Sequence, residues 1–256
     1  MIASLPMYNQ PDCLPALGRY WATIRDALRG AGVAAPDALS WGMPDFVDHW
    51  LRPDLVLSQT CGFPFRAVLQ GKVTLIGTPD YGVDGCPPGY FRSAIVVRAD
   101  DARNSLADYA TARFAYNDAM SQSGWAAPQG FAAGMGFVFE NVLATGAHLR
   151  SARSVLAGVA DIAAIDAVTW RLLCRNDPAL AGLRVLAQTE PTPGLPYIAA
   201  PGAREGVVFA AIKAAIAALS AADRQMLGLR GIVSIPAEAY LAVPTPAPPL
   251  QPALEC

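Results

Sequence analysis

The chain has 256 residues, enough for one large domain or for two of about 100–150 residues each, and in either case it can bury a hydrophobic core. Hydrophobic residues make up 53% of it and charged residues 16%, which favours a folded protein over a disordered one. The formal net charge of −2 provides no basic surface, so we expect no nucleic-acid partner held through its phosphates.

The N-terminus and the longest apolar stretches carry no targeting or membrane pattern. Residues 1–8 lack the positive start and the extended apolar run of a signal peptide, so the sequence as written is not expected to be exported. The stretch 206–222 carries Lys213 at its middle, and residues 126–139 are too few to cross a bilayer. We therefore predict that the chain does not span a membrane.

The predicted elements alternate between strand and helix along the chain. A strand at 2–5 precedes an amphipathic helix that ends at Gly30 or Gly32, with Leu17, Tyr20, Trp21, Ile24 and Leu28 on one face. Further strands are predicted at 54–58, 73–76, 93–97, 113–116, 137–143, 161–165 and 183–187. Helices are predicted at 64–69, 105–109, from 122, at 149–156, 167–174 and 206–222. This alternation predicts an α/β protein with mostly parallel sheets flanked by helices.

Two loop-rich breaks, near residues 82–92 and 190–196, divide the chain. If the outer segments pack together, residues 1–91 and 193–256 form a larger, discontinuous lobe and residues 92–192 a smaller one, joined by two crossover segments with a cleft between them. A single doubly wound sheet fits the periodicity nearly as well. The proline-rich tail, residues 243–256, is expected to be loosely ordered.

The turn between the strand at 113–116 and the following helix is the most informative stretch. It reads Asn-Asp-Ala-Met-Ser-Gln-Ser-Gly-Trp over residues 117–125. Free N–H groups at a helix start, two hydroxyls and no bulky side chain at Gly124 provide the elements of an anion site. Ordinary helix capping by Ser121 would explain the same residues.

Four ordered stretches resemble the phosphonate family of solute-binding proteins, the phosphate, phosphite and phosphonate receptors of ABC transporters with the type 2 periplasmic-binding fold. Ser121-Gln-Ser-Gly124 resembles that family's S-x-S-G anion turn, and residues 90–97 resemble its tyrosine-bearing strand. Thr145-Gly-Ala-His148 with Ser151 is similar to its G-S-H-x-x-S helix start, and residues 158–166 are similar to its G-x-A-D-x-A-x-x-D strand. The resemblance covers about residues 54–197.

The resemblance implies which residues hold the ligand. The oxyanion would bind the turn formed by Ser121, Gln122, Ser123 and Gly124, with Tyr90 and Tyr8 as aromatic donors from the facing lobe. Ser58 and Gln59 would lie at the carboxyl end of a strand, where α/β proteins collect ligands. For each tyrosine, half-buried packing is the alternative.

Three charged or titratable residues join this candidate set. Arg92 offers a planar clamp for an oxyanion or is a solvated side chain at a strand start. His148 donates to the anion or caps its helix, and Asp166 is a ligand carboxylate or a helix cap. Where relatives that bind aminophosphonates have an acidic residue, this chain has Leu149, so we expect no preference for a ligand amine.

The cysteines predict one disulfide and no metal site. Five cysteines show no C-x-x-C pair and only two histidines accompany them. Cys61 and Cys86 follow what the sequence presents as neighbouring strands, so they are candidates for a disulfide, which would require an oxidising compartment.

The expected function is capture of a small oxyanion of the phosphate, phosphite or phosphonate class in an interlobe cleft, for an ABC permease. No nucleophile elbow, P-loop, metalloprotease or dinucleotide motif is present, so neither catalysis nor a cofactor is expected. Two alternatives remain: a cytoplasmic enzyme of the same fold, resembling menaquinone-pathway enzymes, and a cytosolic anion sensor. The family implies a periplasmic monomer, whereas the missing signal peptide favours the cytoplasm.

Overall fold

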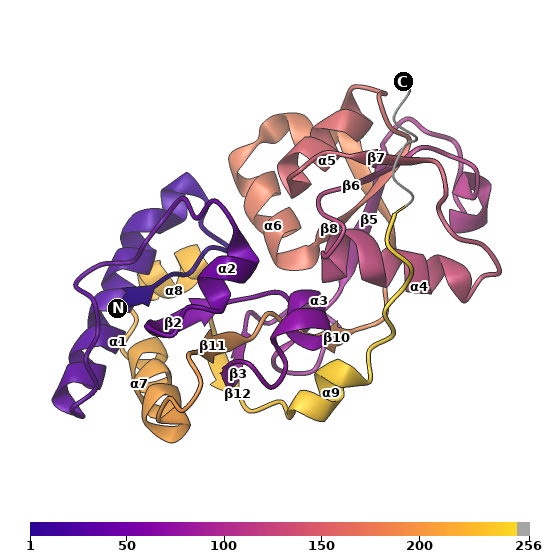
Figure 1. Cartoon of the computed structure of the whole chain (residues 1–256). Helices are drawn as coiled ribbons and strands as arrows, with labels where there is room; N and C mark the ends of the chain where they lie inside the picture. The colour runs from indigo at the N-terminus through magenta and orange to yellow at the C-terminus, as the bar shows by residue number, and fades with distance from the viewer. Residues whose placement is uncertain (250–256) are drawn as a thin grey trace. The chain divides into compact units, whose positions relative to one another are not determined.

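The computed structural model describes residues 1–249, which form two compact units (Figure 1). Unit 1 comprises Met1–Tyr90 and Thr192–Val243, and unit 2 comprises Phe91–Pro191 and, at the C-terminal end of the described chain, Pro244–Pro249. The two inner connections carry β4 (Tyr90–Phe91) and β10 (Thr192–Pro193), which pair as a two-stranded sheet.

The C-terminal segment differs from its predicted place. The sequence predicts that it belongs to the larger lobe, whereas Pro244–Pro249 belong to unit 2. The physical reason is a docking contact: the indole N–H of Trp125 donates to the carbonyl oxygen of Ala247 at 3.0 Å. The chain therefore passes from unit 1 into unit 2 at two places.

Unit 1 is built on a five-stranded mixed sheet in the order β1-β2-β11-β3-β12. Its strands are β1 (Ile2–Ala3), β2 (Leu55–Gln59), β3 (Thr74–Asp80), β11 (Tyr197–Ala199) and β12 (Gly231–Val233). β1 runs parallel to β2, whereas β11 is antiparallel to β2 and β3, and β12 is antiparallel to β3. β2 and β3 are therefore parallel to each other but are separated by β11.

The helices of unit 1 follow from the hydrophobic spacing. In α1 (Leu14–Gly30), Leu17, Tyr20, Trp21, Ile24 and Leu28 are buried, so the predicted apolar face is confirmed. α7 (Glu205–Ala217) packs on α1 and β3 through Val208, Ile212 and Ile216. The remaining helical segments are η1 (Pro11–Cys13), α2 (Phe46–Trp50), α3 (Gly62–Pro64), η2 (Phe65–Leu69), α8 (Ala221–Leu227) and α9 (Ala237–Leu241).

Unit 2 has a second five-stranded mixed sheet, in the order β7-β6-β8-β5-β9. Its strands are β5 (Ser93–Arg98), β6 (Phe114–Tyr116), β7 (Val142–Ala144), β8 (Ile162–Asp166) and β9 (Leu183–Gln188). β6, β7 and β8 run parallel, whereas β5 is antiparallel to β8 and β9. The helical segments are η3 (Leu106–Tyr109), η4 (Gln122–Ala126), α4 (Ala127–Ala133), α5 (His148–Leu156), α6 (Ala167–Asn176) and η5 (Pro178–Gly182).

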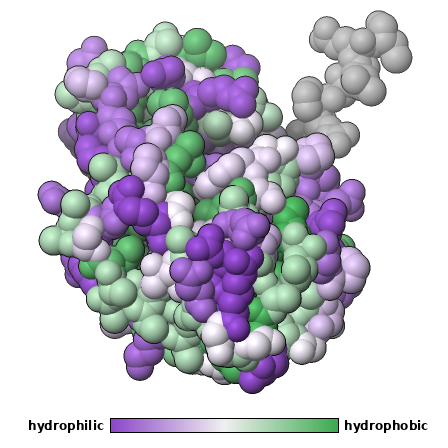
Figure 2. Space-filling view, turned by 90° about the vertical axis from the view of Figure 1, so that its left-hand side faces the viewer, coloured by the Kyte–Doolittle hydropathy of each residue, from purple (hydrophilic) through white to green (hydrophobic). Residues whose placement is uncertain are grey.

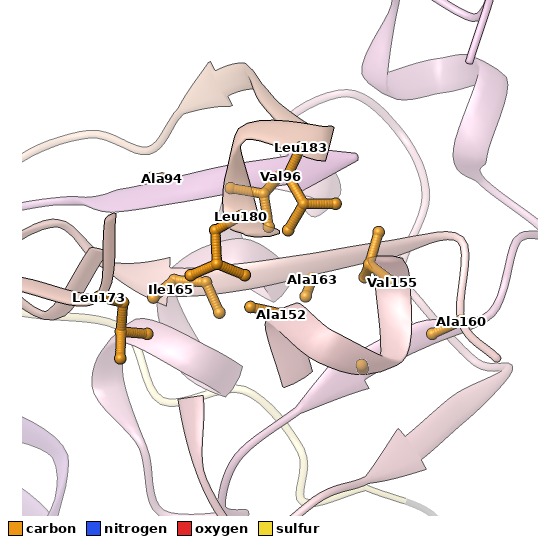
Figure 3. Close-up of a cluster of buried hydrophobic side chains, with 11 residues drawn as sticks. Ala94, Val96, Ala152, Val155, Ala160, Ala163, Ile165, Leu173, Leu180 and Leu183 are labelled. Atoms are coloured by element: carbon orange, nitrogen blue, oxygen red, sulfur yellow. The ribbon is translucent and has the colours of Figure 1, made fainter. Parts of the chain in front are cut away.

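The core of unit 2 explains why its central strands are apolar throughout. Val96 and Ile165 point from β5 and β8 toward Ala152 and Val155 of α5, and Leu180 closes the cluster (Figure 3). All five side chains are almost fully excluded from solvent. Because each buried aliphatic side chain contributes about 1.5–3 kcal/mol, this cluster fixes α5 on the sheet and with it the position of His148.

The α/β class and its flanking helices are confirmed, but two details of the strand prediction are wrong. The sheets are mixed and not mostly parallel, because β5, β11 and β12 enter them in the opposite direction. The strand predicted at 137–143 begins only at Val142. The side chain of Gln129 accepts from the N–H of Phe139 and donates to its carbonyl, both at 2.9 Å, so this backbone is not available to a sheet.

No single helix within residues 1–249 is long and apolar enough to cross a bilayer. α7 and α8 reach the required length and composition only as a pair, and they are bent by 113°. On the face drawn in Figure 2, strongly hydrophobic residues appear as small areas separated by hydrophilic ones.

Candidate functional site

Three helix starts gather at one edge of the unit 2 sheet. β6, β7 and β8 are parallel, so their carboxyl ends lie at the same edge. Each is followed by a helical segment: η4 after Ser121, α5 after Ala147 and α6 after Asp166. Such an edge is where α/β proteins place ligands, because free N–H groups of several helices point toward it.

The turn from Ser121 to Gly124 lies at the first of these helix starts and is buried. The Ser121 hydroxyl oxygen accepts from the N–H of Gly124 at 2.9 Å, and its carbonyl accepts from Trp125 and Ala126 at 3.1 and 3.0 Å. The second of these carbonyl bonds spans five residues and makes the turn π-helical, a form often found at functional sites. The Ser121 O–H proton remains able to donate.

Ser123 joins this turn to His148. Its hydroxyl lies 3.0 Å from Nε2 of His148 and 3.5 Å from the hydroxyl of Ser121. Burial lowers the pKa of His148 to about 4, so the ring is neutral near pH 7. When Nε2 carries the ring proton it donates to Ser123, whose own proton can then be donated to a ligand. The three side chains thus form a connected, neutral polar set, in which the tautomer of His148 sets whether the Ser123 proton goes to the ring or to a ligand.

Gly124 is required by its close surroundings. A Cβ at this position would overlap the amide oxygen of Asn117 and would lie 3.3 Å from the Cε1 atom of His148. That amide oxygen is itself buried and has no hydrogen-bond partner within the described residues. Only glycine therefore allows Asn117 and His148 to approach the turn this closely.

The other candidates of unit 2 lie at the same edge. Asp166 is 2% exposed and accepts from the N–H of Thr169 at 2.8 Å, which is the capping role considered from the sequence. Arg92 donates to the side chain of Gln188 at 2.9 Å in an exposed position. Gln122 is buried within the turn. A ligand contact by any of these three residues stays a prediction.

In unit 1, two of the four candidates line one small cavity at the carboxyl edge of the sheet. Tyr8 and Gln59 border a cavity of about 10 Å³ together with Tyr20, Tyr81 and Tyr197. The ring of Tyr8 meets that of Tyr81 edge-on at 4.7 Å, and Gln59 donates to the Leu195 carbonyl at 3.1 Å. This volume holds about one water molecule.

The remaining candidates of unit 1, Ser58 and Tyr90, contact other side chains of the same unit. The hydroxyl of Ser58 is fully buried and lies 2.7 Å from that of Ser4, which in turn lies 2.7 Å from Nε2 of His49. Tyr90 packs against the hydrophobic cluster around Trp50 and Tyr240, which matches the packing alternative considered for it. Their contact with a ligand also stays a prediction.

The predicted disulfide is wrong. Cys61 and Cys86 are both thiols in the structure. The prediction assumed that the strands before them are neighbours, but β11 lies between β2 and β3. Because strands in a sheet are about 4.8 Å apart, this insertion moves the two strand ends roughly 10 Å apart.

Ser93 and Asn117 belong to this arrangement and were missed from the sequence. The Ser93 hydroxyl donates to the carbonyl of Ser123 at 2.9 Å and thereby holds the turn against β5. Ser93 pairs with Asp166 across β5 and β8, so only the sheet register brings it here. Asn117 lies seven residues before Gly124. Residues at this spacing do not contact each other within a regular helix or strand, so the sequence does not predict their contact.

The geometry defines a two-unit α/β protein with two serine hydroxyls at a buried helix start. Comparisons with known proteins identify its family. The model of the family described as "ABC transporter, phosphonate, periplasmic substrate-binding protein" matches residues 55–239. This match covers more than half of the chain. The chain therefore belongs to the phosphonate family of periplasmic substrate-binding proteins of ABC transporters. No curated protein matches the sequence.

Solved structures share the fold at low sequence identity. PhnD1 from Prochlorococcus marinus, in complex with methylphosphonate, is 18% identical, with a TM-score of 0.70 and coverage of 94% of each chain. XAC2383 from Xanthomonas citri, bound to ATP, is 16% identical, with a TM-score of 0.67 and coverage of 94% of this chain and 97% of that one. A binding-protein component of an ABC phosphonate transporter from Pseudomonas aeruginosa is 15% identical, with a TM-score of 0.62 and coverage of 89% and 77%.

Proposed function

We propose that this protein captures a small oxyanion of the phosphate, phosphite or phosphonate class at the Ser121–Gly124 turn and delivers it to an ABC permease in the periplasm. The observation that carries the proposal is the hydrogen-bonded set of Ser121, Ser123 and His148 at a buried helix start. Hydroxyls and backbone N–H groups donate to an anion without requiring a buried cation, and the neutral imidazole supports the Ser123 hydroxyl. The family membership and the methylphosphonate complex of PhnD1 support the same ligand class.

Binding at this turn requires that hydrogen-bond donors become free for the ligand. The N–H group of Ser123 lies in the first turn of the helix, where N–H groups have no carbonyl partner within the helix. The Ser121 oxygen accepts from Gly124, which leaves the Ser121 O–H proton able to donate to a ligand. Two hydroxyls and a backbone N–H group match several oxygens of a tetrahedral anion.

We expect phosphate, phosphite or methylphosphonate to raise the melting temperature. A ligand present at 100 times its dissociation constant stabilises the folded state by about 2.7 kcal/mol. For a chain of this length the shift is roughly 5–10 °C. Differential scanning fluorimetry with these anions and with ATP, followed by titration calorimetry, measures it.

Ser123→Ala is the matched test of the turn, because it removes one donor and its bond to His148. Ser154→Ala, on α5 but outside the turn, is the control. We expect Ser123→Ala to reduce the anion-induced shift by at least half while the control keeps it. Flat melting curves with every anion, together with silent calorimetry, would contradict the proposed function.

The ligand class is expected to lack an amine. Leu149, at the place where an acidic partner would stand, packs against the core of unit 2, and the carboxylate of Asp166 already caps α6. An ammonium without a carboxylate partner is costly to desolvate. Titration calorimetry should therefore show 2-aminoethylphosphonate binding no more than about tenfold, or 1.4 kcal/mol, tighter than ethylphosphonate. A larger preference for the amine would show that another carboxylate reaches the ligand.

A further inference from the structure

A groove on unit 2 lies beside the helix that carries the anion turn. Its open space has a volume of about 480 Å³ and is lined by Trp125, Phe139, residues of α4 and Pro244–Pro249 of the C-terminal segment. Ala126 and Ala133 of the helical stretch line it with methyl groups, and Gly130 lines it with its backbone. An aromatic side chain next to small residues forms the kind of shallow, apolar surface on which an extended proline-rich chain can lie.

One wall of this groove is the chain's own C-terminal segment, Pro244–Pro249, which runs beside α4 (Figure 1). It reads Pro-Thr-Pro-Ala-Pro-Pro, so its backbone favours the extended polyproline conformation and offers carbonyls with few competing N–H groups. The indole N–H of Trp125 donates to the Ala247 carbonyl at 3.0 Å. Recognition domains of the SH3 and WW kind likewise bind proline-rich segments in grooves lined by aromatic side chains.

Trp125 connects this groove directly to the anion turn. It follows Gly124 in sequence, and its backbone N–H donates to the carbonyl of Ser121 at 3.1 Å. Its ring is 3% exposed and lies 5.0 Å from that of Tyr116, at the end of β6. A residue fixed at its backbone by the turn and at its indole by the C-terminal segment couples the two.

We propose that Pro244–Pro249 is a strap that docks in cis on Trp125, beside α4, and holds the Ser121–Gly124 turn in its anion-binding arrangement. By linkage, docking of the strap and binding of the anion then favour each other. The strap is also a covalent connection, because the chain leaves unit 1 at Val243 and joins unit 2 at Pro244. The coupling rests on the proposed function, whereas the docking does not.

Two truncated chains test docking of the strap separately from its coupling to anion binding. A chain that ends at Val243 lacks the strap, and a chain that ends at Pro249 keeps it and is the matched control. Hydrogen exchange followed by mass spectrometry measures how well docking protects the backbone amides of residues 121–133, and it needs no ligand. We expect exchange there to be at least tenfold faster in the chain that ends at Val243 and unchanged in the control. Equal exchange in both chains would overturn the strap.

Titration calorimetry then compares the affinities of the two truncated chains for methylphosphonate, which measures the coupling. We expect the chain that ends at Val243 to bind at least fivefold more weakly than the control, with Trp125→Phe in the full chain showing a smaller loss, since it removes only the indole donor. Equal affinities despite faster exchange would overturn the coupling. If the control itself fails to bind, the proposed function fails and the coupling with it, while the exchange data still decide docking. Protection that depends on protein concentration would instead assign the strap to a second copy.

Discussion

Replacing Gly124 with alanine is expected to weaken anion binding by about 100-fold, or roughly 2.7 kcal/mol. The added methyl group would overlap the buried amide oxygen of Asn117, so the Asn117 side chain must rotate or the turn must move. Either shift disturbs the Ser121 and Ser123 hydroxyls, which lie 3.5 Å apart, and the 3.0 Å contact of Ser123 with His148. Overpacking of this kind also costs about 1–3 kcal/mol of stability. Titration calorimetry and urea unfolding measure the two effects.

Gly18→Ala is the matched control for this change. Gly18 lies inside α1 of unit 1, outside the unit that carries the turn, and nothing lies within 4 Å of the position of its Cβ. Because alanine is the better helix former, we expect this variant to be unchanged or more stable by up to about 1 kcal/mol. The double variant Gly124→Ala, Asn117→Ala removes the overlapping oxygen and should recover most of the lost stability. A Gly124→Ala variant that binds like the original chain would show that the anion does not use this turn.

Acidification from pH 6.5 to 4 is expected to destabilise the protein through His148. Burial lowers the pKa of this histidine in the folded state to about 4, below its ordinary value of 6.5. Between these two values the unfolded chain binds a proton that the folded chain does not. The contribution to stability is therefore complete above about pH 6.5 and is lost as the pH falls toward 4, with an upper limit of about 3 kcal/mol.

Urea unfolding at several pH values, with His148→Gln as the variant, tests this expectation. Glutamine can keep a hydrogen bond to Ser123 but does not titrate, so the slope of stability with pH should become flatter. Burial also lowers the pKa of His49, the other histidine, so His49→Gln is measured beside it. The two imidazole signals in NMR titrations give the pKa values directly. A His148 that titrates near 6.5 would contradict the argument.

The local elements were predictable because their patterns need no partner. The apolar face of α1 and the fully buried strand β5 both follow from side-chain spacing or run length alone. The directions and order of strands did not follow, since β11 enters the unit 1 sheet from residues 197–199, far from β2 and β3 in sequence. The failed disulfide between Cys61 and Cys86 is a direct result of this, as it depended on which strands are neighbours.

The candidate site shows the same division. Ser121, Ser123 and Gly124 are contiguous and resemble a known motif, so the sequence could nominate them, and His148 came from a second motif. The structure brings His148 to Ser123 across 25 residues. Ser93 and Asn117 reach the turn only through the sheet register and through the close approach that Gly124 permits. Their positions depend on packing, which a periodicity argument does not contain.

The position of β11 also determines the order in which the chain can fold during synthesis. β2 and β3 leave the ribosome early, but the strand that pairs with both of them ends at Ala199. At about 5–20 residues per second, some 120 residues of translation separate them, or roughly 6–25 s. During this time both strands have open edges, which favour association with other chains. All five strands of unit 2, by contrast, are complete by Gln188. Unit 2 can therefore fold first, although the ribosome begins with unit 1.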